Sequence, residues 1–115
     1  GEKAAAAGFD WKDHGGAMEK VEEELQELKE AISDGDRGMI RHELGDLLMS
    51  LSSLGRHLEA PPEESLREAN DRFKLRFSTM EKLAKQRSLV LAEAGDETLD
   101  ALWEQAKRLC KDKDA

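Results

Sequence analysis

The chain has 115 residues, enough for one domain with a hydrophobic core, and its 38% apolar and 38% charged composition with only two Pro favours helices. Its formal net charge of −8, without a basic stripe, argues against nucleic acid as a partner. No apolar run has the length of a membrane span, no signal-peptide pattern occurs, and Cys110 is alone. We therefore expect a cytoplasmic protein without a membrane or nucleic-acid partner.

Residues 1–115 are predicted to form a single domain, with frayed ends at residues 1–8 and 111–115. The sequence begins with GEKAAAA rather than Met, which is typical of a processed or excised domain, and a stand-alone form also stays open.

The first predicted helix spans residues 16–33, and its apolar residues recur at helical spacing: Val21, Leu25, Leu28 and Ile32. Gly35 is expected to end it in the left-handed conformation, and Asp36 is expected to cap the next helix. That second helix spans residues 37–59 and has a wide apolar face: Ile40, Leu44, Leu47, Leu48, Leu51, Leu54 and Leu58. We expect other helices or a second subunit to cover it on more than one side, with Gly45 and Gly55 allowing close approach of another backbone.

The third predicted helix runs from Pro62 to Gln86, with Glu63 and Glu64 near the positive end of its dipole. Its apolar stripe is Leu66, Ala69, Phe73, Phe77, Met80 and Leu83. A connection follows, and Asp96 is expected to cap a fourth helix whose apolar residues are Leu99, Leu102, Trp103, Ala106 and Leu109.

Two carboxylates interrupt the apolar segment HELGDLLMSL of the second helix: Glu43 and Asp46 lie three residues apart on one face. Burying them is costly without compensation. Glu24 and Glu27 have the same spacing on the first helix, and Glu27 and Glu43 are equally far from Gly35, so the two pairs face one another across an antiparallel hairpin. Because four converging carboxylates repel unless cations lie between them, we predict an all-oxygen Mg²⁺ site that Mn²⁺ can also occupy.

Two other interpretations compete with this site. The glutamates of the first helix could form an ordinary solvated face, which is less convincing for Glu43 and Asp46 among leucines. A di-iron bundle needs Glu-x-x-His pairs, and none of the three histidines has an acid three residues before it. We therefore expect His42 and His57 to lie at the surface or to make structural hydrogen bonds.

The third and fourth helices carry cations beside aromatic residues. Arg72 and Arg76 are four residues apart and can bind phosphate oxygens, or can pair with surface acids. Lys107 follows Trp103 by four residues, and Trp103 and Trp11 are candidates for stacking on a base, although a core position is the usual one for Trp103. Carboxylates for metal, cations for phosphate and Trp for a base together indicate a metal-dependent site for a nucleoside polyphosphate. No P-loop or Ser–His–Asp pattern suggests another chemistry.

The blocks GFDW, EKVEEELQEL, HELGDLL, LGRHL, PPEESLREANDRFKLRF and LWEQAK resemble the MazG-type nucleoside triphosphate pyrophosphohydrolases of the all-α NTP pyrophosphatase superfamily. The resemblance implies an all-α, four-helix-bundle-type domain, an antiparallel hairpin plus two further helices, that forms a homodimer or higher homo-oligomer. It implies Mg²⁺-dependent cleavage of nucleoside triphosphates to monophosphate and pyrophosphate, with broad base tolerance that includes damaged nucleotides. The metal ligands it implies are Glu24, Glu27, Glu43 and Asp46, and the substrate contacts are Asn70, Arg72, Arg76, Trp103 and Lys107.

Three positions depart from the family pattern: Met49 stands where the family has Phe, Ser53 where it has Asn, and Arg72 where it has Lys. The replacement of Lys by Arg72 preserves the charge. We expect metal-bound water to attack near the α–β phosphate bridge, with Glu23 or Glu24 as general base. Two alternatives remain: a dUTP or phosphoribosyl-ATP pyrophosphohydrolase of the same fold, and a non-catalytic helical dimerisation or regulatory module.

Overall fold

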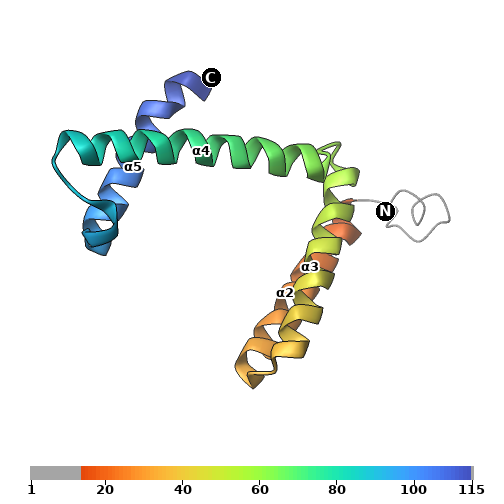
Figure 1. Ribbon diagram of the computed structural model, residues 1–115. Coiled ribbons are helices and arrows are strands. Elements are labelled where there is room, and N and C mark those ends of the chain that lie inside the picture. The colour runs from red at the N-terminus through yellow and green to blue at the C-terminus, as the bar shows by residue number, and fades with distance from the viewer. Residues whose placement is uncertain (1–13, 115) are drawn as a thin grey trace. The chain divides into compact units, whose positions relative to one another are not determined.

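The computed structural model describes residues 14–114, and all regular structure in that range is helical, as the composition predicts. Its elements are α2 (His14–Asp34), α3 (Arg37–His57), α4 (Pro62–Gln86), the short 3₁₀ helix η1 (Leu91–Glu93) and α5 (Asp96–Asp114) (Figure 1). The predicted frayed segment 1–8 and Trp11 lie outside the described residues. Within the described range, no helix combines the length and apolar character that a membrane span requires.

The chain divides into two compact units, with the boundary between Ser65 and Leu66 in the first turn of α4. The described part of unit 1 contains α2 and α3. Unit 2 contains the rest of α4, η1 and α5.

A tight turn joins α2 to α3, which lie side by side and antiparallel (Figure 1). Gly35 has a φ of +71°, a conformation that glycine adopts without the Cβ clash of other residues, and its N–H donates to the Ala31 carbonyl at 3.0 Å. Oδ1 of Asp36 accepts from the Met39 N–H at 3.2 Å. The predicted stop at Gly35 and N-cap at Asp36 are both confirmed.

The buried face of α2 is not the predicted apolar stripe. Ala17, Glu24 and Ala31 are buried instead, one every seven residues, whereas Leu25 and Ile32 are 40% and 58% exposed. On α3 the buried residues are Glu43, Ser50, Ser53 and Leu54. The buried residues of this helix pair are therefore mostly small or polar. Most of the predicted apolar face of α3 is left uncovered within unit 1.

Close backbone approach is confirmed at one of the two predicted glycines. A Cβ on Gly55 would lie 2.7 Å from the carbonyl oxygen of Ala60, in the turn that follows α3. A Cβ on Gly45 would meet no atom of the described chain within 4 Å.

Unit 2 has its own apolar core between the C-terminal half of α4 and α5. Its buried members are Met80, Leu83, Ala84, Leu102 and Ala106, against which Leu91, Leu99 and Trp103 pack. The predicted core positions Phe73 and Phe77 are instead 55% and 40% exposed.

The start of α5 differs from the prediction. Asp96 is its first residue rather than its cap, since the Leu99 N–H already donates to the Gly95 carbonyl at 3.0 Å. The helix continues past Leu109, the last residue of the apolar spacing, to Asp114.

Candidate metal centre

Three of the four predicted metal ligands converge between α2 and α3. Carboxylate oxygens of Glu24, Glu27 and Glu43 lie within 4.8 Å of one another. The residues of Glu24 and Glu43 are only 4% and 8% exposed. The turn at Gly35 positions them, because it aligns the two helices in opposite directions and so places residues equally far from the turn opposite each other.

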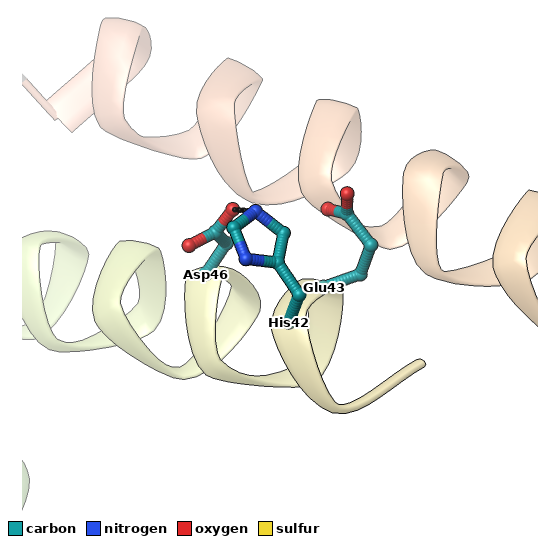
Figure 2. A group of neighbouring side chains, drawn as sticks. All are labelled: His42, Glu43 and Asp46. Atoms are coloured by element: carbon teal, nitrogen blue, oxygen red, sulfur yellow. Dashed lines mark ion pairs between the residues drawn. The ribbon is translucent and has the colours of Figure 1, made fainter. Parts of the chain in front are cut away.

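Asp46, the fourth predicted ligand, belongs to an adjoining group with His42 and Glu43, shown in Figure 2. Nε2 of His42 lies 3.2 Å from Oδ2 of Asp46, one helical turn further along α3. Donor atoms of these three residues also lie within 4.8 Å of one another, so Glu43 belongs to both groups. His42 is exposed, as predicted, but its proximity to Asp46 was not predicted, although the four-residue spacing between them could have indicated it.

Lys20, which was not among the predicted site residues, also contacts the acidic group. Its Nζ lies 2.8 Å from Oε1 of Glu24 and 3.7 Å from Oε1 of Glu23. The hydrogen bond from Lys20 holds the pKa of Glu24 below its usual value, and the same bond raises the pKa of Lys20. The signal for this pair was the four-residue spacing from Lys20 to Glu24 along one helix face.

The pKa of Glu27 is shifted in the opposite direction from that of Glu24. Its hydrogen bond with Glu24, the negative charge of Glu24 and the proximity of Glu43 raise the pKa of Glu27 to about 7. Glu27 therefore binds a proton at a higher pH than an isolated carboxylate does, because two negative charges at this distance repel. A cation that displaces the proton would remove the same repulsion.

Two carboxylate oxygens of this group could bind a divalent cation. Oε2 of Glu24 and Oε2 of Glu43 are both buried, and neither has a hydrogen-bond partner among the described residues. A buried carboxylate oxygen without a partner is costly, and a cation bound to it would offset that cost. Since the donors of the Glu24, Glu27 and Glu43 group are all oxygens, Mg²⁺ or Mn²⁺ fits them.

A cavity of about 310 Å³ opens beside this group at the turn end of the hairpin. Its lining residues are Glu27, Glu30, Ala31, Asp34, Asp36, Met39 and Glu43. Most of them are acidic, so an anionic ligand could enter only together with cations.

The remaining predicted site residues have varied surroundings. Glu23 is exposed on α2, and Asn70 and Arg72 are exposed on α4. In unit 2, Lys107 forms an ion pair with Glu104 at 3.0 Å, and the Trp103 ring lies 5.6 Å from the Phe73 ring, centroid to centroid. Arg76 is partly buried. Trp11 lies outside the described residues. The roles of these residues in substrate binding stay predictions.

Most of the chain is similar in sequence to one known protein family. Residues 12–87 match the model of the MazG nucleotide pyrophosphohydrolase domain. The chain belongs to this family. The match includes both acidic pairs, Arg72 and Arg76, and it ends before α5.

Curated relatives agree with the family assignment. The chain is 49% identical over 106 residues to the nucleoside triphosphate pyrophosphohydrolase/pyrophosphatase MazG of Thermotoga maritima, covering 92% of this chain and 40% of that protein. It is 34% identical over 110 residues to the nucleoside triphosphate pyrophosphohydrolase of Escherichia coli, covering 92% of this chain and 41% of that protein. The chain thus spans about two fifths of the length of these relatives.

Proposed function

We propose that this MazG-family chain hydrolyses nucleoside triphosphates to nucleoside monophosphate and pyrophosphate with Mg²⁺. The observation that carries the proposal is the group of Glu24, Glu27 and Glu43, in which one oxygen each of the buried Glu24 and Glu43 has no hydrogen-bond partner among the described residues. Two curated relatives are named for this activity on nucleoside triphosphates.

We assign roles to the residues of this group and to three neighbouring residues, Glu23, Asp46 and Lys20. Glu24, Glu27, Glu43 and Asp46 hold the cation, and Glu23 or Glu24 accepts a proton from the attacking water. The bound Mg²⁺ supplies positive charge against the triphosphate and lowers the pKa of water. Lys20 keeps Glu24 ionised, so that this carboxylate is ready to bind a cation.

The substrate part of the proposal depends on the cationic and aromatic residues. Arg72, Arg76 and Lys107 contact phosphate oxygens, Asn70 donates a hydrogen bond, and Trp103 and Trp11 lie near the base. Few polar residues are available to discriminate between bases, so we propose broad base tolerance and a role in removing non-standard nucleotides.

The proposal includes a homodimer through α3. Leu44, Leu48, Met49 and Leu51 are 45–65% exposed within this chain. A row of large apolar side chains on one helix is typical of an interface with another helix, since contiguous apolar surface is costly in water.

The test is pyrophosphate release from a panel of ribo- and deoxyribonucleoside triphosphates, with Mg²⁺ and with a chelator. Mg²⁺-dependent release together with a monophosphate product is the expected result, and similar rates across bases would support the broad tolerance. Phosphoribosyl-ATP is assayed beside the panel, and release from dUTP alone or from phosphoribosyl-ATP alone would replace the broad activity with a specific one. Thermal stabilisation by nucleotides without any release would favour a binding module.

A further inference from the structure

We propose that Phe73 is a positioning residue of the base subsite, whose ring holds the indole of Trp103 in the orientation that stacks on a nucleobase. The inference rests on the proposed function and deepens it, because the contact of Trp103 with the base is part of that proposal. Its evidence is a cluster of three aromatic rings within unit 2, those of Phe73, Phe77 and Trp103.

The three rings connect α4 to α5. The ring centroids of Phe73 and Trp103 are 5.6 Å apart, with an angle of 46° between the ring planes. Phe73 and Phe77 lie one turn apart on α4, with centroids 6.0 Å apart and planes at 13°. Both separations are those of favourable aromatic pairs, so each ring restricts the rotation of its neighbour. Phe73 is the central ring, because it contacts the other two.

The cluster is too exposed to act only as a core. Phe73 and Phe77 are 55% and 40% exposed, whereas the buried core of unit 2 begins one turn further along α4, at Met80. Trp103 packs against that core and is partly buried. Neighbouring aromatic rings that remain exposed to water are typical of a binding surface.

The charges beside the rings favour a nucleotide as the ligand of this surface. Arg72 precedes Phe73 directly, and Arg76 follows it by one helical turn. Lys107 follows Trp103 by one turn, and its ion pair within α5 joins side chains that are 38% and 57% exposed, so this pair can be exchanged at little cost. Aromatic rings stack on bases, and neighbouring cations bind phosphate oxygens. An indole that is already fixed in place loses less conformational entropy when the base binds.

The experiment compares two ligands of which only one has a base: α,β-methylene-ATP, whose α–β bridge cannot be hydrolysed, and inorganic tripolyphosphate. Calorimetry in the presence of Mg²⁺ measures the dissociation constant of each ligand. The proteins are wild type, Phe73→Leu, Phe73→Tyr and the control Leu66→Ala, since Leu66 is 63% exposed on α4 and lies outside the ring cluster. Circular dichroism checks that each variant keeps its helicity.

We expect Phe73→Leu to weaken the binding of α,β-methylene-ATP by about tenfold and to leave tripolyphosphate binding unchanged, because only the first ligand stacks on Trp103. The KM for ATP should rise by a similar factor with kcat retained. Phe73→Tyr keeps the ring and should restore wild-type binding, and Leu66→Ala should behave as wild type. Equal weakening of both ligands by Phe73→Leu, or no weakening, would overturn the proposal. An equal effect of Leu66→Ala, with a changed mass in light scattering, would instead assign this surface to a second copy of the chain.

The two proposals can fail separately. Unchanged nucleotide binding in Phe73→Leu, with intact Mg²⁺-dependent pyrophosphate release, would reject only the role of Phe73. Binding of α,β-methylene-ATP that depends on Phe73, without pyrophosphate release from any nucleotide, would reject only the pyrophosphohydrolase activity.

Discussion

Lys20 and Glu24 lie one turn apart on α2, and the Lys20 ammonium is 2.8 Å from Oε1 of the buried Glu24 carboxylate. This contact compensates one of the negative charges that the hairpin brings together. Lys20 keeps part of its ammonium in water, since its side chain is 34% exposed. It therefore stabilises the carboxylate group without itself being deeply buried.

Replacing Lys20 by Met should destabilise the metal-free chain by about 1–3 kcal/mol at neutral pH, because Glu24 would remain buried without its donor. The lowered pKa of Glu24 means that this stabilisation is present above its usual pKa and is lost as the pH falls through the lower folded-state value. Urea unfolding at pH 7 and at acid pH measures the difference. The exposed Lys29 provides the control Lys29→Met, and an equal loss in both variants would argue against the contact.

Glu27 should have the opposite pH dependence. Its pKa is about 7 in the folded chain, above the ordinary 4.5, so the folded state binds the proton more tightly than the unfolded state. The contribution of Glu27 to the free energy of unfolding of the metal-free chain is therefore greatest below pH 4.5 and decreases as the pH rises through 7. Glu27→Gln should flatten that part of the stability profile in urea unfolding, whereas the exposed Glu30→Gln should not. Parallel wild-type and Glu27→Gln profiles would show that the proton is held elsewhere.

Glu43 is the residue on which the proposed activity depends most. Glu43→Gln should lower Mg²⁺-dependent pyrophosphate release by about 100-fold or more, since metal stabilisation of transition-state charge is worth several kcal/mol. Circular dichroism should show unchanged helicity. Glu22→Gln removes an exposed carboxylate of α2 and should retain full activity. Full activity of Glu43→Gln would remove it from the proposed catalytic group.

Gly55 is expected to tolerate no side chain. Gly55→Ala should destabilise the chain by about 1–3 kcal/mol, because the new Cβ would lie 2.7 Å from the Ala60 carbonyl oxygen and the turn after α3 would have to shift. Gly45→Ala, in the same helix but with open space around the new Cβ, should instead stabilise the helix by up to about 1 kcal/mol. Thermal unfolding of the two variants checks the contrast, and similar midpoints would refute it.

The sequence predicts the hairpin well because its signals are local. A glycine that ends one helix and an aspartate that caps the next act through backbone geometry within a few residues, and both behave as predicted. It predicts three of the four carboxylates of the acidic group for the same reason, since equal distances from one turn bring Glu27 and Glu43 together, whereas Asp46 lies in the adjoining group with His42. Helical periodicity did not predict which face of α2 is buried, because it identifies an apolar stripe but not what covers that stripe. The buried residues of α2 are Ala17, Glu24 and Ala31 instead.

The uncovered face of α3 leads to the last prediction. Leu48 is 57% exposed, and if this face forms a homodimer, Leu48→Glu would place a charge in an apolar interface. We expect the variant to be monomeric, or to dissociate at concentrations about 100-fold higher than wild type, since an unpaired buried charge costs several kcal/mol. Val90 is equally exposed and lies outside α3, so Val90→Glu is the matched control and should leave the oligomeric state unchanged. Size-exclusion chromatography with light scattering measures the mass of each protein across a dilution series. A monomeric wild type, or a Leu48→Glu variant that remains a dimer at wild-type concentrations, would exclude this face as the dimer interface.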